Sequence, residues 1–248
     1  MRMLILGVGD AFTRRHFGSS AIIEGPQGLV LIDCPDPIHR TVNEASLRAG
    51  WPIDTSQIHD IIITHLHGDH CNGLESFGFA RRLARMRDAA MPKPRLHVSQ
   101  PVAERVWQKL APAMDASMGQ SRPSTLEDYF ELRTLSPDRP AQIAGLTVRC
   151  RFTQHPVPTI GLLASNGRNT IGWSADTPFE QEHIDWLAKG ADIFVHESNR
   201  GPAHTPIESL NRLDAKVKKK MRLIHLPDDF DPQTTDISIL REGDVLNV

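Results

Sequence analysis

The sequence predicts one mixed α/β domain that spans all 248 residues. Three observations lead to this prediction. Short apolar segments rich in β-branched residues alternate with longer segments whose apolar residues recur at helical spacing. The length fits one large α/β domain at least as well as two small ones. Finally, no internal repeat, low-complexity tract or linker divides the chain.

The first half of the chain predicts strands and two helices. The expected strands cover residues 4–7, 20–24, 29–34, 60–64 and 96–99. Asp36 as a cap and Pro37 at the first helical position predict the start of a helix, which Gly50 ends. A second helix carries its apolar face over residues 102–110, and we expect Pro112 to end it.

The second half begins with the region that is hardest to interpret. Residues 115–139 are interrupted by Pro123 and Pro137. A lid or a dimerisation arm are alternatives for this region, and we expect a surface insertion there. Further strands are expected at residues 146–152, 162–164, 170–173, 192–195 and 222–224. Thr177 and Thr205 each begin a Thr-Pro-x-Glu sequence, which predicts a capping box with proline at the first helical position. The helix after Thr205 is expected to continue to Val217 on one apolar face.

Composition limits the class of partner and the compartment. The formal net charge is −2, so no overall field would attract a large nucleic acid or an anionic membrane. The three cysteines, Cys34, Cys71 and Cys150, are a poor disulfide framework and fit a reducing compartment. No segment approaches the roughly 18–20 apolar residues of a membrane span. We therefore expect a cytoplasmic protein that acts on a small molecule.

One motif dominates the sequence. Thr64-His65-Leu66-His67-Gly68-Asp69-His70 directly follows an apolar strand. Imidazole and carboxylate groups are the ligands that suit zinc and neighbouring transition metals. These four polar side chains can converge if the strand ends in a tight turn, which Gly68 permits. The motif thus predicts a metal-binding crevice beyond the carboxyl end of a strand.

Further ligands are expected at the ends of other strands. His155, Asp176 and His225 each follow a predicted strand within a few residues. A histidine alone is weak evidence, because most are structural or surface residues. The four ligands of the motif do not complete two metal sites. His155, Asp176 and His225 together supply the missing ligands, at the edge of a sheet where strands end.

With these residues in place, the chain resembles the metallo-β-lactamase superfamily, over nearly its whole length. The resemblance implies a four-layered αβ/βα sandwich and two divalent metal ions, Zn²⁺ first, with Mn²⁺ or Fe²⁺ as alternatives. It implies that His65, His67 and His155 hold one ion, and that Asp69, His70 and His225 hold the other. It also implies that Asp176 bridges the two ions and that the protein forms a homodimer.

Within this superfamily the chain is most similar to the phosphodiesterase branch around ribonuclease Z. The similar segments are residues 7–12, 155–161 and 174–177, together with the pairs His196-Glu197 and His204-Thr205. This resemblance implies hydrolysis by attack of a metal-bound hydroxide, which Asp69 would orient. His204 would steady a phosphoryl oxygen or protonate the leaving oxygen.

Several residues are expected to support this site. His196 and Glu197 are expected to orient metal ligands, and Asp33 to brace the metal loop through hydrogen bonds. Arg14, Arg15 and His16 in the opening loop could contact a phosphate, although three solvated loop residues are the alternative.

One departure from ribonuclease Z restricts the expected substrate. Ribonuclease Z inserts a long arm that grips transfer RNA between the third histidine and the bridging aspartate. Here only 20 residues separate His155 from Asp176, enough for a hairpin and no arm. We therefore expect a small phosphodiester, such as a cyclic nucleotide.

Four other functions are compatible with the same fold. A lactonase or a thioesterase of the glyoxalase II kind would have nearly the same metal site. Redox di-iron members replace the second motif histidine with glutamate, and His67 is intact here. A non-catalytic binding module is less consistent with the sequence, since none of the seven expected ligands is missing.

Overall fold

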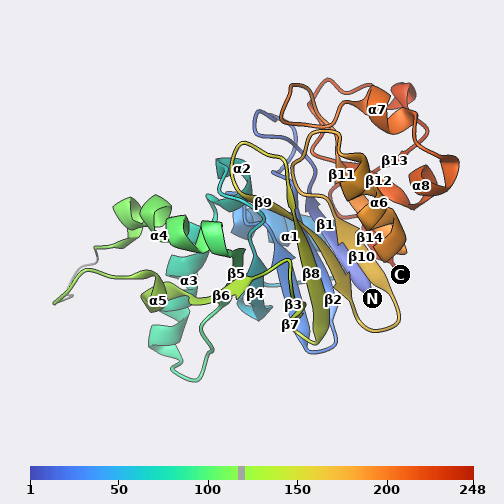
Figure 1. Cartoon of the computed structure of the whole chain (residues 1–248). Helices are drawn as coiled ribbons and strands as arrows, with labels where there is room; N and C mark the ends of the chain where they lie inside the picture. The colour runs from blue at the N-terminus through green and yellow to red at the C-terminus, as the bar shows by residue number, and fades with distance from the viewer. Residues whose placement is uncertain (117–120) are drawn as a thin grey trace.

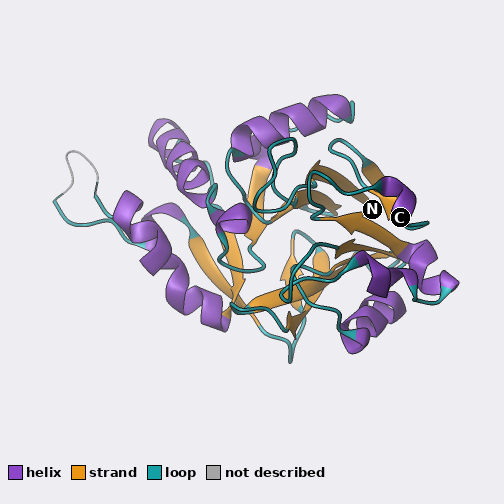
Figure 2. Ribbon diagram, turned by 90° about the horizontal axis from the view of Figure 1, so that it is seen from above, coloured by secondary structure: helices purple, strands orange, loops and turns teal. Residues whose placement is uncertain are grey.

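The structure is a computed structural model that describes residues 1–116 and 121–248. Its described residues form two sheets of seven strands each, which pack face to face. Helices cover the outer face of each sheet, so that the chain forms four layers, as seen from above in Figure 2. The predicted four-layered αβ/βα sandwich is confirmed.

The first sheet has the strand order β14-β1-β2-β3-β4-β5-β6. Its strands are β1 Arg2–Gly7, β2 Ser20–Gly25, β3 Gly28–Ile32, β4 Ile58–Ile62, β5 Arg95–Ser99, β6 Glu131–Leu135 and β14 Val245–Asn247. β1, β2 and β3 pair antiparallel, whereas β3 to β6 run parallel. The carboxyl ends of four strands therefore meet at one edge of this sheet.

The second sheet has the order β13-β12-β11-β10-β9-β8-β7. Its strands are β7 Ala141–Ile143, β8 Leu146–Thr153, β9 Thr159–Ser165, β10 Thr170–Trp173, β11 Ile193–Glu197, β12 Met221–Ile224 and β13 Ser238–Ile239. β10 to β13 run parallel, so this sheet also collects strand ends at one edge.

Helices flank both sheets, as Figure 1 shows. They are α1 Ile38–Arg48, α2 Gly68–Cys71, α3 Leu74–Arg87, α4 Gln100–Met114, α5 Leu126–Tyr129, α6 Gln181–Gly190, α7 Ile207–Asn211 and α8 Ala215–Lys220, with short 3₁₀ turns at Thr55–Gln57 and Pro232–Thr234. Among the described residues, no helix is long and apolar enough to cross a membrane.

Three apolar layers hold the sandwich together. The central one, which includes Ile5, Val30 and Ile160, lies between the two sheets. A second layer packs α1, α3 and α4 on the first sheet, and a third packs α6 and α7 on the second. Burying a large apolar side chain contributes roughly 1.5–3 kcal/mol, so these layers fix the strand edges that carry the site.

The expected strands are all present, with ends that shift by a few residues. The helix starts are less accurate. The first helix begins at Ile38 rather than Pro37, and it has no side-chain cap. Pro112 does not end its helix, since α4 continues to Met114. Met114 is fully buried, and its burial offsets the one backbone hydrogen bond that a proline in the last turn removes.

Both predicted capping boxes are wrong. The helix after Thr177 begins only at Gln181, and the segment after Thr205 forms two short helices, α7 and α8, instead of one. The Thr177 hydroxyl donates to the Glu180 carboxylate, and the Thr205 hydroxyl donates to the Thr177 carbonyl. Both threonines therefore bind other groups near the strand ends and cannot cap the helices that follow.

The region 115–139, expected to be a surface insertion, partly lies outside the described residues, which omit 117–120. The described part contains α5 and β6, and β6 pairs in parallel with β5 at the end of the first sheet. The Tyr129 hydroxyl donates to the Met114 carbonyl at 2.8 Å, so α5 is tied to the end of α4.

Candidate metal centre

The motif that begins at Thr64 leaves the first sheet directly after β4. The chain turns at Gly68 into the short helix α2, at the upper end of the sheets in Figure 1. A Cβ at Gly68 would lie 2.6 Å from the Asn72 side-chain amide, so a larger residue there would move the end of that side chain. This tight turn directs His65, His67, Asp69 and His70 toward the same side.

The other expected ligands come from the second sheet. His155 follows β8, Asp176 follows β10 and His225 follows β12. Asp176 and His225 are 2% exposed, and the His155 side chain is 1% exposed. The two sheet edges therefore bring all seven expected side chains into one buried cluster, in two groups.

The first group consists of His65, His67, His155 and Asp176. The Nδ1 atom of His67 lies 3.2 Å from His65 Nε2 and 3.1 Å from His155 Nε2. Asp176 Oδ2 lies 3.7 Å from His65 Nε2 and 3.9 Å from His155 Nε2. Three imidazole nitrogens and one carboxylate oxygen thus converge, which is a typical donor set for a transition metal.

The second group consists of Asp69, His70 and His225. Asp69 Oδ2 lies 3.3 Å from both His70 Nε2 and His225 Nε2. Asp176 reaches this group too, because its Oδ1 lies 3.4 Å from His70 Nε2 and its Oδ2 lies 3.7 Å from His225 Nε2. The Asp176 carboxylate therefore faces both groups.

Hydrogen bonds behind the cluster set the histidine tautomers. The Thr64 hydroxyl donates to Asp33 Oδ2, so it must accept from His65 Nδ1 at 3.0 Å. His70 Nδ1 donates to the same Asp33 oxygen at 2.9 Å. His155 Nδ1 lies 3.2 Å from the Ala203 carbonyl, which can only accept. In each case the protonated nitrogen points away from the cluster and Nε2 presents its lone pair to it.

These residues fit a divalent cation. His70 Nε2 is buried without a hydrogen-bond partner, although it lies beside two carboxylates. A buried polar atom is rarely left unsatisfied, and a cation at this position would satisfy it. The oxygen and imidazole donors suit zinc, manganese or iron.

The pKa values of the histidines differ between the two groups. Burial lowers the pKa of His65 well below its usual value and that of His155 to about 4. Burial also acts on His225, but the Asp176 charge and the Asp69 hydrogen bond raise its pKa to about 9. The histidines of the first group are thus neutral, which is the form that ligates metals. The carboxylates beside His225 favour positive charge at the second group, which a bound cation would supply.

His204 and Glu197 form a pair at the rim of the cluster. His204 Nδ1 donates to Glu197 Oε1 at 3.0 Å and lies 3.9 Å from Asp176 Oδ2. The pKa of His204 is raised, because the Glu197 hydrogen bond and charge outweigh the effect of burial. Its side chain is 21% exposed, whereas that of Glu197 is 1% exposed. The Glu197 carboxylate therefore favours the protonated form of His204 at the opening of the site.

The structure does not bring every expected residue to the cluster. His196 faces the α6 side of β11, opposite Glu197, and its Nδ1 binds the Glu197 carbonyl at 2.7 Å. Its described contacts reach none of the expected ligands, so it does not orient them. Arg14, Arg15 and His16 are exposed, and their described contacts run to Asp228 and Glu242.

Backbone geometry at the site had no signal in the sequence. Asp33, Ala175 and His225 all have positive φ angles of 54–60°, which non-glycine residues rarely adopt. Such conformations concentrate at functional sites, where the surrounding structure maintains them. The Ser174 hydroxyl, which accepts from the Glu197 backbone N–H at 2.9 Å, was also not predicted. It fixes the strand end that carries Glu197.

Comparison with known proteins agrees with this geometry. Residues 1–244 match the family model described as anti-Pycsar protein Apyc1. The chain belongs to the Apyc1 family. An anti-Pycsar protein Apyc1 from Paenibacillus sp. (strain J14) is 29% identical, and the match covers 99% of this chain and 98% of that protein.

Two further proteins extend the comparison. The cGMP-dependent 3′,5′-cGMP phosphodiesterase A of Dictyostelium discoideum is 24% identical over 96% of this chain, which corresponds to 27% of that longer protein. The crystal structure of the metallo-β-lactamase fold protein YhfI from Bacillus subtilis has a TM-score of 0.80 at 17% identity, and the match covers 99% of this chain and 98% of YhfI. The family model covers nearly the whole chain, and the structural likeness confirms the predicted metallo-β-lactamase fold.

Proposed function

We propose that this chain is a phosphodiesterase that hydrolyses 3′,5′-cyclic nucleotides with two divalent cations. The observation that carries the proposal is the pair of ligand groups that share Asp176, with His204 held at their rim. Membership of the Apyc1 family and similarity to a cGMP phosphodiesterase support the same substrate class.

The chain's own side chains have distinct roles in this proposal. His65, His67 and His155 hold one cation, Asp69, His70 and His225 hold the other, and Asp176 joins them. Cations bound there would activate a water molecule and neutralise charge on the phosphoryl oxygens. Asp69 is 15% exposed at its side chain, so its carboxylate can also orient the attacking water.

The reaction forms one bond to phosphorus and breaks another. The water oxygen bonds to phosphorus, and one ester P–O bond breaks to give a phosphate monoester and an alcohol. The leaving oxygen needs a proton, and His204 holds one at the opening of the site, oriented by Glu197. We infer that His204 donates this proton, with Nδ1 bound to Glu197 and Nε2 directed to the substrate.

A small substrate is consistent with the chain's length and charge. The hairpin between His155 and Asp176 consists of β9 and β10 and has no arm for a large nucleic acid. The net charge of −2 provides no general attraction for a polyanion. A cyclic nucleotide requires neither feature.

A substrate panel tests the proposal. The purified chain, loaded with Zn²⁺ or Mn²⁺, is assayed with four cyclic nucleotides, bis(p-nitrophenyl) phosphate, a lactone and a thioester. We expect turnover of the cyclic nucleotides, which is lost in His67→Ala. Turnover of the lactone or the thioester alone would refute the phosphodiesterase assignment and leave the fold standing.

The identity of the metal and the assembly state are also proposals. We infer that the two cations are Zn²⁺, and elemental analysis of the purified chain tests this through a zinc-to-protein ratio of two. A homodimer follows from the family resemblance, and a cytoplasmic location follows from the sparse cysteines. Light scattering after size-exclusion chromatography tests the dimer through a mass of twice 27.7 kDa.

A further inference from the structure

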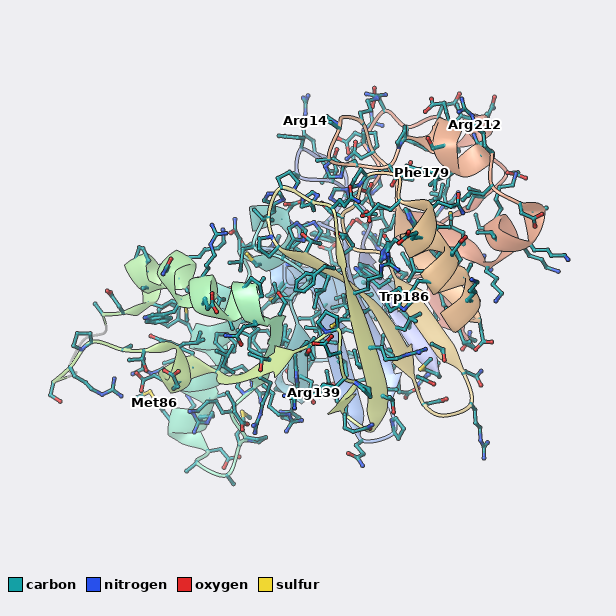
Figure 3. The ribbon with its side chains drawn as sticks, viewed as in Figure 1. Arg14, Met86, Arg139, Phe179, Trp186 and Arg212 are labelled. Atoms are coloured by element: carbon teal, nitrogen blue, oxygen red, sulfur yellow. The ribbon has the colours of Figure 1, made fainter. Side chains whose placement is uncertain are left out.

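The opening loop between β1 and β2 lies against the metal centre at both ends. At its start, Gly9 bridges to Leu226, the residue after His225. At its end, a Cβ placed on Gly18 would lie 2.9 Å from the carbonyl oxygen of Asp69. Residues 10–17 therefore stand beside the second ligand group. Figure 3 shows Arg14 of this loop at the same upper end of the molecule as Phe179, which follows Asp176.

Polar contacts anchor this loop on several sides. Asp10 accepts from the Phe12 backbone N–H at 3.0 Å and from Asn199 Nδ2 at 3.0 Å. The Thr13 hydroxyl donates to Asp228 at 2.6 Å, and the Arg14 backbone N–H donates to the same carboxylate at 2.8 Å. The loop is thus held in one shape by side chains from the second half of the chain.

Phe12 lies in the middle of this anchored loop and is 87% exposed. It is the most exposed large hydrophobic side chain among the described residues; Met86 on α3 follows at 77%. The anchored loop thus presents one aromatic ring to solvent beside the metal centre.

We propose that Phe12 stacks on the nucleobase of the substrate while the metal centre holds its cyclic phosphate. The inference rests on the proposed function and adds the residue that recognises the base. Base–aromatic stacking accepts every base, because each has a π face. Arg14 and Arg15 lie two and three residues after Phe12 and are exposed, so the loop combines an aromatic ring with positive charge. That combination suits an anionic nucleotide more than an apolar surface of a second chain.

The experiment compares two substrates that differ only in the base. One is cyclic GMP, and the other is the methyl riboside 3′,5′-cyclic phosphate, which has no base. Phe12→Ala should raise KM for cyclic GMP about 5- to 150-fold, the range that loss of one stacking contact predicts. The kcat for cyclic GMP and both constants for the baseless substrate should stay near wild type, and Phe12→Trp should restore KM. Met86→Ala, remote from the loop in Figure 3, is the matched control and should change nothing.

A second readout does not depend on turnover. The fluorescence of F12W should be quenched by a phosphorothioate cyclic nucleotide, beyond any change in the wild-type protein. The baseless analogue should leave it unchanged.

Two results would overturn the inference alone. Equal losses of Phe12→Ala on both substrates would mean that Phe12 supports the loop and not the base. Dissociation of a dimer on Phe12→Ala, measured by light scattering, would assign the ring to a second copy of the chain. A wild-type protein that is active on neither substrate would instead refute the proposed function itself, and the stacking role with it.

Discussion

The substitution Asp33→Asn tests how the chain controls its metal ligands. Asp33 is fully buried, and its carboxylate accepts from the Thr64 backbone N–H at 2.8 Å, from the Thr64 hydroxyl at 2.9 Å and from His70 Nδ1 at 2.9 Å. Asparagine preserves the shape, and it tolerates the φ of 58° at this position. It replaces one acceptor oxygen with an N–H donor.

The consequence can be followed atom by atom. In the wild type, the Thr64 hydroxyl and His70 Nδ1 both donate to Asp33. In the variant, the new amide donor would face these two donors. The hydroxyl must turn round and donate to His65 Nδ1, and this places the His65 proton on Nε2, inside the cluster. The amide donor likewise favours the His70 tautomer that carries its proton on Nε2. Both ligand groups then lose a lone pair that a cation requires.

The expected magnitude is a 10- to 100-fold loss of metal affinity, or about 1.4–2.7 kcal/mol. The assay is competition for zinc with a chromophoric chelator, combined with thermal unfolding to confirm that the fold persists. Asp36→Asn, three residues away and exposed, is the matched control and should keep wild-type affinity. Unchanged zinc affinity in folded Asp33→Asn would refute the tautomer argument.

Three further predictions concern catalysis and stability. His204→Ala should lower kcat about 10²- to 10⁴-fold with little change in KM, because the proton of His204 is needed only as the P–O bond breaks. A p-nitrophenolate leaving group needs no proton. An equal loss of kcat on a substrate with that leaving group would argue against the role of His204. Asp60 is 2% exposed and binds Arg95 and His97; burial raises its pKa, but these partners bring the net value from 3.8 to about 2. Its contribution to stability is therefore present above pH 3.8 and lost as the pH falls through about 2. Asp60→Asn should lower the free energy of unfolding near pH 7 by at most about 2 kcal/mol, measured in urea, since Arg95 is partly exposed and screened; an unchanged midpoint would contradict this. Phe77→Ala, which empties a fully buried position on α3, should lower the same free energy by about 3–5 kcal/mol, and a loss below about 1 kcal/mol would mean that the core collapses around the gap.

The metal motif was readable from sequence because its physics is local. A β-branched strand, a glycine turn and four ligating side chains lie within a few residues, so their convergence follows from one turn. His155, Asp176 and His225 were readable because each follows a strand, and parallel strands end at one edge.

Other features depend on contacts between distant segments. Thr205 has the sequence of a helix cap, yet its hydroxyl donates to the Thr177 carbonyl, 28 residues away, and this long-range hydrogen bond overrides the local preference. The orientation of His196 depends on its place in the β11 pleat, which a one-residue shift would reverse. The exposure of Phe12 depends on Asp228 and Asn199, both more than 180 residues away in the chain. No local pattern carries this information.

The most direct test of the central claim is a ³¹P NMR time course of cyclic GMP hydrolysis in ¹⁸O-enriched water by the zinc-loaded chain. The account predicts that the cyclic phosphodiester signal is replaced by a monoester signal that carries one ¹⁸O isotope shift, because the water oxygen bonds to phosphorus. No monoester signal should form with His67→Ala. A cyclic phosphodiester signal that persists unchanged with the metal-loaded wild type would contradict the account.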